Sequence, residues 1–447
     1  MPPIAGDLSG DPSRQSPAPR QTRLDSYVDR YAVRTHGMQA SEIRALFAVA
    51  SRPEVVSLAG GMPNISGLPI NAVAATLSDL VRERGSDAMQ YGSGQGDPTL
   101  RSQICEVMAL EAIKAHPDDV VVTVGSQQAV DLVTRVFCDP GDVVICEAPS
   151  YVGALGAFRA YQCDVVHVQM DDHGLVPTAL AQAIASVTRS GRRPKFLYTI
   201  PNFHNPAGVT MSSDRRSEVL DICRNADLLI LEDNPYGLLG FDGDALPALR
   251  AGDSERVVYL GSFSKTFAPG FRVGWALAPH AVREKLVLAQ ESSTLCPPTF
   301  SQLAVSAYLS KHDWQSQIKD FNEMYRERRD AMLSALDAHM PAGATWTIPR
   351  GGFYVWVTLP DGLDATTMLP RAVTARVAYV PGTAFYADGF GAGCMRLSYC
   401  YPSPERIEEG VRRLAGVIAD ELELRATFGA TRRTVTQGYE GPSPDQA

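Results

Sequence analysis

A lysine close to two hydroxyl groups and an arginine makes one passage of this chain well equipped for chemistry. The passage is SFSKTFAPGFRVGW, residues 262–275, and it follows an apolar run. Such a loop can bind an anion through Ser262, Ser264 and Arg272 while it presents the amine of Lys265. Most lysines are solvated surface charges, so the motif predicts a site only if other passages agree with it.

Two further passages place polar side chains directly after apolar runs. LLILEDNPYG, residues 228–237, carries Asp233 and Tyr236, and YTIPNFHNPAG, residues 198–208, carries Asn205 in a Pro/Gly turn. Ligands of open α/β sheets bind at the carboxyl edge of the strands, where these side chains would meet. Taken singly, the aspartate is equally explained by a turn or a helix cap, and Asn-Pro turns are common.

A fourth passage has the pattern of a strand, a glycine and the start of a helix. In VTVGSQQAV, residues 122–130, the backbone N–H groups, Ser126 and Gln127 can receive a phosphate on the helix dipole.

The elements that must position these passages alternate between strands and helices. Between residues 120 and 278, β-branched runs such as VVVTV, DVVICE, KFLYTI and VVYLGS alternate with helical patterns. This alternation predicts an α/β fold whose mostly parallel sheet is covered by helices. After Pro297 a long amphipathic helix and the strands FYVWVTL and MRLSY predict a smaller α+β domain.

These patterns divide the chain into five stretches. We expect a disordered leader at 1–24, an N-terminal arm and part of the small domain at 25–80, the large domain at 81–310, the C-terminal small domain at 311–424, and a disordered tail at 425–447.

Composition excludes several classes of protein. The chain has 447 residues, 45% of them hydrophobic, and no apolar run approaches the ~20 residues of a membrane span. The leader lacks the apolar core of a signal peptide, which places the chain in the cytoplasm. A net charge of -9 argues against nucleic acid as a partner. The 8 cysteines include no CxxC pair, against both a disulfide framework and a zinc site, so we expect no metal.

The four passages, in their order along the chain, resemble those of fold-type I pyridoxal-phosphate aminotransferases of class I/II. The resemblance is to the 2-aminoadipate and kynurenine aminotransferase group, and it runs from about Met38 to Ala419. It is carried also by GGMPNISGLP, EAPSYVGA, PRGGFYVW and VPGTAFYADG. The resemblance implies a mostly parallel, mixed, seven-stranded sheet in the large domain and pyridoxal 5′-phosphate as the cofactor.

Roles at the cofactor follow from the resemblance. Lys265 matches the lysine that holds the cofactor as a Schiff base and shuttles the substrate's α-proton, and Asp233 matches the aspartate that keeps the pyridine nitrogen protonated. Asn205 and Tyr236 match the partners of the ring's phenolate oxygen, and Tyr151 matches the aromatic residue that stacks on the ring. The residues expected at the phosphate are Ser126, Gln127, Ser262, Ser264, Arg272 and, across the interface of a homodimer, Tyr91.

The substrate is implied in the same way. Arg396 in CMRLSY matches the arginine that grips the substrate's α-carboxylate, with Asn205 and Gly61 beside the substrate. Ser41 and Arg44 in MQASEIRALF match residues that meet a distal carboxylate, although Arg44 is equally explained as an ordinary helix arginine. The expected reaction is a ping-pong exchange between an L-amino acid (2-aminoadipate, glutamate, branched-chain or aromatic) and a 2-oxo acid such as 2-oxoglutarate.

The chain departs from the group's usual pattern at the Asn205 turn. His204 and Ala207 stand where the group usually has Gln and Thr. His204 is either a hydrogen-bond donor behind the residues of the site or an accommodated polar side chain.

Two other classes of function compete with amino transfer. The fold also hosts lyases, decarboxylases and cyclising synthases that use the same cofactor. A transcriptional regulator that contains this fold would also need a winged-helix DNA-binding domain, and the residues before Leu24 leave no room for one.

Overall fold

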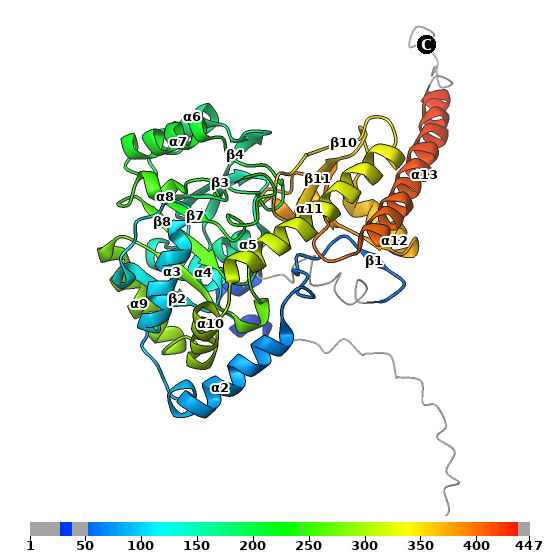
Figure 1. Cartoon of the computed structure of the whole chain (residues 1–447). Helices are drawn as coiled ribbons and strands as arrows, with labels where there is room; N and C mark the ends of the chain where they lie inside the picture. Colours follow the sequence, from blue (N-terminus) through cyan, green and yellow to red (C-terminus); the bar gives the residue numbers. More distant parts are fainter. Residues whose placement is uncertain (1–26, 38–51, 244, 437–447) are drawn as a thin grey trace, which may run out of the picture.

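The computed structural model describes residues 27–37, 52–243 and 245–436, which form a large and a small domain (Figure 1). The large domain is built on a sheet with the strand order β2-β9-β8-β7-β6-β3-β4-β5. The strands are β2 (Val120–Thr123), β9 (Gly274–Leu277), β8 (Val257–Ser262), β7 (Leu229–Asp233), β6 (Pro194–Thr199), β3 (Val143–Ala148), β4 (Asp164–Asp171) and β5 (Gly174–Leu175).

The central strands of this sheet are parallel and its margins are antiparallel. β8, β7, β6, β3 and β4 pair in parallel, whereas β9 runs antiparallel to β8 and to β2. The predicted α/β class with a mostly parallel, mixed sheet is confirmed. We expected seven strands, whereas the sheet has an eighth, β5, which has only 2 residues and pairs with β4. A run that short has no periodicity that would reveal it in the sequence.

Helices cover both faces of the sheet, which is why its strands are apolar on both sides. One face carries α4 (Ser126–Phe137), α5 (Val152–Ala160) and α9 (His280–Thr294). The other carries α3 (Pro98–Ala109), α6 (Pro177–Arg189) and α7 (Ser213–Asn225). Successive residues of β2 alternate accordingly, since Val121 packs in the cluster with α4 while Val120 and Val122 pack in the cluster with α3.

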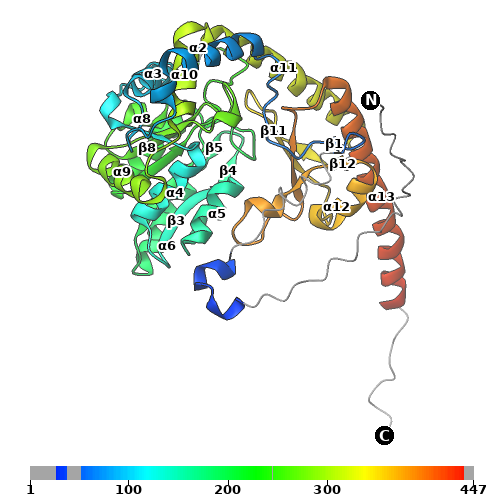
Figure 2. The ribbon, with the colours of Figure 1, turned by 90° about the horizontal axis from the view of Figure 1, so that it is seen from below.

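The small domain is an antiparallel sheet backed by long helices. Its strands lie in the order β10 (Thr345–Trp346), β11 (Tyr354–Thr358), β14 (Cys394–Ser398) and β13 (Val380–Pro381). The helices are α11 (Trp314–His339), α12 (Ala365–Thr374) and α13 (Pro404–Thr436), with α13 projecting past the domain in Figure 2. β1 (Val56–Ser57) pairs with β12 (Val377–Ala378), which ties an early segment to this domain.

Two expected boundaries differ from the structure. α2 (Ile70–Ala88) runs across the boundary expected at residue 80, and α10 (Thr299–Lys311) packs against it. The tail expected to be disordered from residue 425 continues α13 as far as Thr436. A helix that α11 already anchors extends without a new nucleation step. The expected leader lies outside the described residues. No helix among the described residues is long and apolar enough to span a membrane.

Candidate functional site

A cavity of about 320 Å³ lies at the carboxyl edge of the large sheet, where the small domain meets it. The sheet contributes residues from the segments that follow β2, β3, β6, β7 and β8, and the small domain contributes residues from β11 and β14. The residues predicted from the sequence that line it are Gly61, Ser126, Tyr151, Asn205, Asp233, Tyr236, Lys265 and Arg396. The structure therefore brings these expected residues into one site.

Lys265 presents its amine in a place that favours the neutral form. It follows β8, and its Nζ donates to the carbonyl oxygen of Gly61 at 2.7 Å. The pKa of this amine is lowered from 10.5 to about 8: burial is the largest cause, Cys400 opposes it, and the cations of Arg396 and Arg272 act in the same direction as burial. Close to neutral pH a substantial fraction of the amine is free to act as a nucleophile or base.

One carboxylate oxygen of Asp233 is available to a ligand in the cavity, and the other accepts a hydrogen bond from the protein. Its Oδ2 accepts a hydrogen bond of 2.8 Å from Tyr198 Oη, while its Oδ1 is buried with no partner among the described residues. Burial raises the pKa of Asp233 to about 6, and the hydrogen bond from Tyr198 works in the opposite direction. A buried acceptor without a partner is costly, so this oxygen fits a ligand that brings an N–H group or a cation.

A group suited to an anion lies beside Ser126, which lines the cavity, although Arg272 and Ser264 do not line it themselves. α4 begins after Gly125, whose φ of +75° favours glycine, and no side chain caps its N-terminus. Arg272 lies against it, so that a Cβ on Gly125 would stand 2.5 Å from Arg272 Nη2. Arg272 Nη1 also lies 3.4 Å from Ser264 Oγ. A guanidinium, a hydroxyl and the positive end of a helix dipole therefore converge there.

Two of the predicted phosphate residues have hydrogen bonds within the protein. Gln127 Nε2 donates to the carbonyl oxygen of Gly153 at 2.8 Å. Ser262 Oγ accepts from the backbone N–H of Ser264 at 3.1 Å. Both side chains hold the loops beside the anion end, and neither lines the cavity.

Arg396 is a buried cation that carries no carboxylate counter-ion among the described residues. It is 2% exposed. Its Nη1 donates to Asn205 Oδ1 at 2.9 Å and its Nη2 to the carbonyl oxygen of Ala59 at 2.8 Å. The guanidinium carbon lies 4.2 Å from the ring centroid of Tyr354 and 5.0 Å from that of Phe385. A desolvated guanidinium held only by neutral groups favours an incoming carboxylate.

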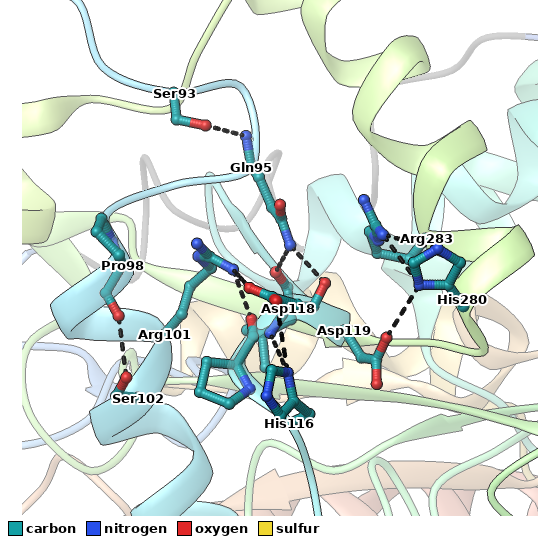
Figure 3. A network of polar contacts seen from close by, with 12 residues as sticks. Ser93, Gln95, Pro98, Arg101, Ser102, His116, Asp118, Asp119, His280 and Arg283 are labelled. Carbon is teal, nitrogen blue, oxygen red and sulfur yellow. Dashed lines mark hydrogen bonds and ion pairs between the residues drawn. The ribbon is translucent and has the colours of Figure 1, made fainter.

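Tyr91 lies apart from this cavity. It is 77% exposed and does not line the cavity of its own chain. Its loop is nonetheless held firmly, because Gln95 Nε2 donates to the carbonyl oxygens of Asp118 at 2.7 Å and Val120 at 3.0 Å (Figure 3). The other two predicted residues, Ser41 and Arg44, lie outside the described residues.

Two functional residues had escaped the sequence analysis. Tyr198, within β6, bonds Asp233, and Tyr354, on β11, lines the cavity with its hydroxyl 3.4 Å from that of Tyr236. A tyrosine within a strand expected to be buried is a usable signal for the first, because its hydroxyl needs a partner. Tyr354 gives no comparable signal, since its neighbour comes from another domain.

Pyridoxal phosphate fits this site. The partnerless Asp233 Oδ1 suits a protonated ring nitrogen, and the Arg272 end suits the phosphate. The neutral fraction of Lys265 suits attack on the aldehyde. No group of His, Cys, Asp and Glu that could hold a metal ion occurs in the described part of the chain.

Known proteins resemble this chain over most of its length. Residues 53–414 match the family described as aminotransferase class I and II. Aromatic-amino-acid aminotransferase 1 of Thermococcus litoralis is 42% identical over 400 residues, which are 89% of this chain and 96% of that protein. The 2-aminoadipate transaminase of Thermus thermophilus is 38% identical over 391 residues, 87% of this chain and 96% of that protein.

A solved structure extends the resemblance to three dimensions. The crystal structure of Pyrococcus horikoshii kynurenine aminotransferase in complex with PMP superposes with a TM-score of 0.84 at 39% identity. The alignment covers 88% of this chain and 98% of that one.

Proposed function

The chain belongs to the class I and II aminotransferases, and from that premise we propose which of its residues perform each part of amino-group transfer. It is a pyridoxal-phosphate-dependent transaminase, so the family, the cofactor and the reaction expected from the sequence are confirmed. The relatives described above are named for amino transfer, which does not favour the lyase, decarboxylase or synthase alternatives.

One observation carries the assignment of roles. A buried amine, a buried carboxylate oxygen and a buried guanidinium line a single cavity, and within the described residues the oxygen has no hydrogen-bond partner and the guanidinium no counter-ion. Lys265, Asp233 and Arg396 supply these groups. Each is unfavourable alone, and an amino acid bound with the cofactor satisfies all of them.

The cofactor would be held at both ends. Arg272, Ser264 and the N-terminus of α4 would bind its phosphate, and Asp233 Oδ1 would keep the proton on the pyridine nitrogen. Asn205, Tyr236 and Tyr151 line the cavity, so Asn205 and Tyr236 would bind the phenolate oxygen and Tyr151 would pack against the ring. When bound, the cofactor supplies an electron-withdrawing ring that accepts the electron pair left at the substrate's α-carbon.

Lys265 acts at the reacting atoms. Its neutral Nζ would hold the cofactor's aldehyde carbon, and once the substrate's amine has displaced it, the same Nζ would take the proton from the substrate's α-carbon and hold it for return. Burial of this amine supports the role, because it lowers the pKa towards the pH at which the enzyme works.

Arg396 selects amino acids and 2-oxo acids through their carboxylate. Two parallel N–H groups of one guanidinium match the two oxygens of a carboxylate and so fix the α-carbon beside Lys265. The amino acid leaves as a 2-oxo acid before the second substrate enters. We extend the proposal to acidic, branched-chain or aromatic donors, with Gly61 beside the substrate and Ser41 and Arg44 assigned to a distal carboxylate.

We also propose a homodimer that works in the cytoplasm. The exposed Tyr91, on a loop held by Gln95, supports the dimer, because an ordered and exposed aromatic residue is suited to contact a second copy. Sedimentation of the purified protein and mutation of Tyr91 test it.

The cytoplasmic location rests on the composition of the first 24 residues, and cell fractionation tests it.

The decisive experiment follows the absorbance of the bound cofactor. Single amino acids should bleach the yellow colour of the holoenzyme, and 2-oxo acids should restore it. Lys265→Ala should abolish trapping of the cofactor by borohydride, with Lys285→Ala as the matched control. Persistent labelling of Lys265→Ala, or a colour that no amino acid changes, would contradict the assignment.

A further inference from the structure

His204 is buried behind the cavity and faces a buried carboxylate. His204 is 0% and Glu147 is 1% exposed. His204 Nε2 lies 3.1 Å from Glu147 Oε2. Neither side chain lines the cavity, so neither touches a ligand there. The two groups form a buried polar contact within the protein, at the position where the chain departs from the usual pattern of its group.

Glu147 is fixed by partners from a neighbouring strand. It lies in β3, which pairs with β6, and its Oε1 accepts from Thr199 Oγ1 at 2.7 Å. Its Oε2 accepts from the backbone N–H of Ile200 at 2.8 Å. The carboxylate therefore lies at the ends of two parallel strands and presents a fixed acceptor to His204.

His204 in turn closes the loop that follows β6. Its Nδ1 accepts from the backbone N–H of Ala207 at 3.2 Å, and its backbone bonds Val209 at 2.8 Å and Gly208 at 2.6 Å. Because Nδ1 accepts, the proton of a neutral ring is on Nε2, the atom that faces Glu147. The ring therefore fixes the loop through its hydrogen bond at Nδ1, while Nε2 lies against the Glu147 carboxylate without forming a well-aligned hydrogen bond.

The loop that His204 closes carries Asn205, which joins the two halves of the site. Asn205 Oδ1 accepts from Arg396 Nη1 at 2.9 Å, which leaves the Nδ2 donor of Asn205 for the cavity that it lines. A shift of this loop would therefore change both the direction of Arg396 and the donor offered to the cofactor.

We propose that Glu147 and His204 form a positioning pair that holds Asn205, so that Arg396 meets the substrate's carboxylate and Asn205 meets the cofactor's phenolate oxygen. This inference rests on the proposed roles of Asn205 and Arg396. It predicts that loss of the pair changes substrate binding and the spectrum of the cofactor together, although the pair touches neither.

The test removes both ring nitrogens and keeps a ring. In His204→Phe the KM for the amino acid should rise roughly tenfold, because the loop loses the buried hydrogen bond from Ala207 and the polar contact with Glu147. The pH midpoint of the cofactor's absorbance should shift upward by roughly half a unit, because the phenolate loses a donor. His204→Gln, which keeps a donor and an acceptor, should recover most of both effects. Glu147→Gln should change both quantities in the direction of His204→Phe.

His167 supplies a matched control. Its Nε2 accepts from the backbone N–H of Ala387 at 2.9 Å, and its Nδ1 lies 3.1 Å from the backbone carbonyl of Glu147. His167→Phe thus removes two hydrogen bonds beside the same glutamate without touching the Asn205 loop. It should lower the Tm but leave the KM and the absorbance midpoint unchanged.

The outcomes separate this inference from the proposed function. If His204→Phe lowers the Tm as His167→Phe does and keeps the wild-type KM and midpoint, the pair is structural only and the inference is overturned. If His204→Phe does not fold, a wild-type KM and midpoint in Glu147→Gln overturn it equally. Wild-type holoenzyme that no amino acid bleaches would instead overturn the proposed function.

Discussion

The cofactor end and the substrate end of this cavity are built in different ways. The cofactor end uses β7 and the segments that follow β2 and β8, three strands of one sheet, so Ser126, Asp233 and Lys265 each lie within a few residues of a strand end. The substrate end joins Arg396 of β14 to Ala59, 337 residues away, and to Asn205, 191 residues away. The first is fixed by one sheet, whereas the second depends on how two domains pack.

The largest effect should come from the cofactor end, at Asp233. Asp233→Asn keeps the shape of the side chain but removes the charge that holds a proton on the ring nitrogen, so kcat should fall by roughly 10²–10³. Single-turnover measurements of the bleaching step would test this. Tyr198→Phe is the matched control, since it removes the 2.8 Å hydrogen bond and keeps the carboxylate, and it should lose far less. Equal losses in the two variants would contradict the role of the charge.

The uptake of cofactor by the apoprotein should depend on pH through Lys265. Below its pKa of about 8 the amine is protonated and cannot attack the aldehyde. The rate should therefore rise about tenfold per pH unit up to that value and then level off. Stopped-flow absorbance would follow the reaction, with N-acetyl-lysine as a control for the cofactor's own ionisation. A midpoint near 10.5, the ordinary value for lysine, would mean that the amine is not desolvated.

The strand pattern of the sequence alone points to the proposed cofactor end better than to the proposed substrate end, and the reason is geometric. Lys265, Asp233 and Ser126 follow apolar strands, and the rule that ligands bind at the carboxyl edge brings them together without knowledge of their distances. The contacts of Arg396 with Ala59 and Tyr354 join segments that no local pattern relates. The pairing of His204 with Glu147 was equally hidden, because 57 residues and a strand crossing separate them.

A smaller effect is expected where the substrate end holds the carboxylate. Arg396→Lys keeps the charge but removes the fork that bonds Asn205 and Ala59 at the same time, so the KM for the amino acid should rise by about tenfold or more. Because Lys265 and Asp233 keep their contacts, kcat at saturation should fall much less. Steady-state kinetics would separate the two. Arg350→Lys, whose side chain is 72% exposed, is the control. An unchanged KM would remove Arg396 from the substrate site.

The smallest effect should come from Tyr354, and it tests whether the substrate end depends on packing rather than on hydrogen bonds. The ring centroid of Tyr354 lies 4.2 Å from the guanidinium carbon of Arg396, whereas the hydrogen bond between its hydroxyl and that of Tyr236 is long, at 3.4 Å. Tyr354→Leu removes the ring, and with it a cation–π contact of about 0.5–2 kcal/mol, so the KM should rise by roughly twofold to thirtyfold.

Tyr354→Phe keeps that ring and should change the KM by less than about twofold, since a weak hydroxyl contact contributes little. The ratio of the two effects is the informative measurement. If Tyr354→Phe is as damaging as Tyr354→Leu, the hydroxyl beside Tyr236 is what matters, and Tyr354 belongs with the cofactor end. If only Tyr354→Leu raises the KM, the ring holds Arg396 in place. The substrate end then depends on packing between the domains, unlike the cofactor end.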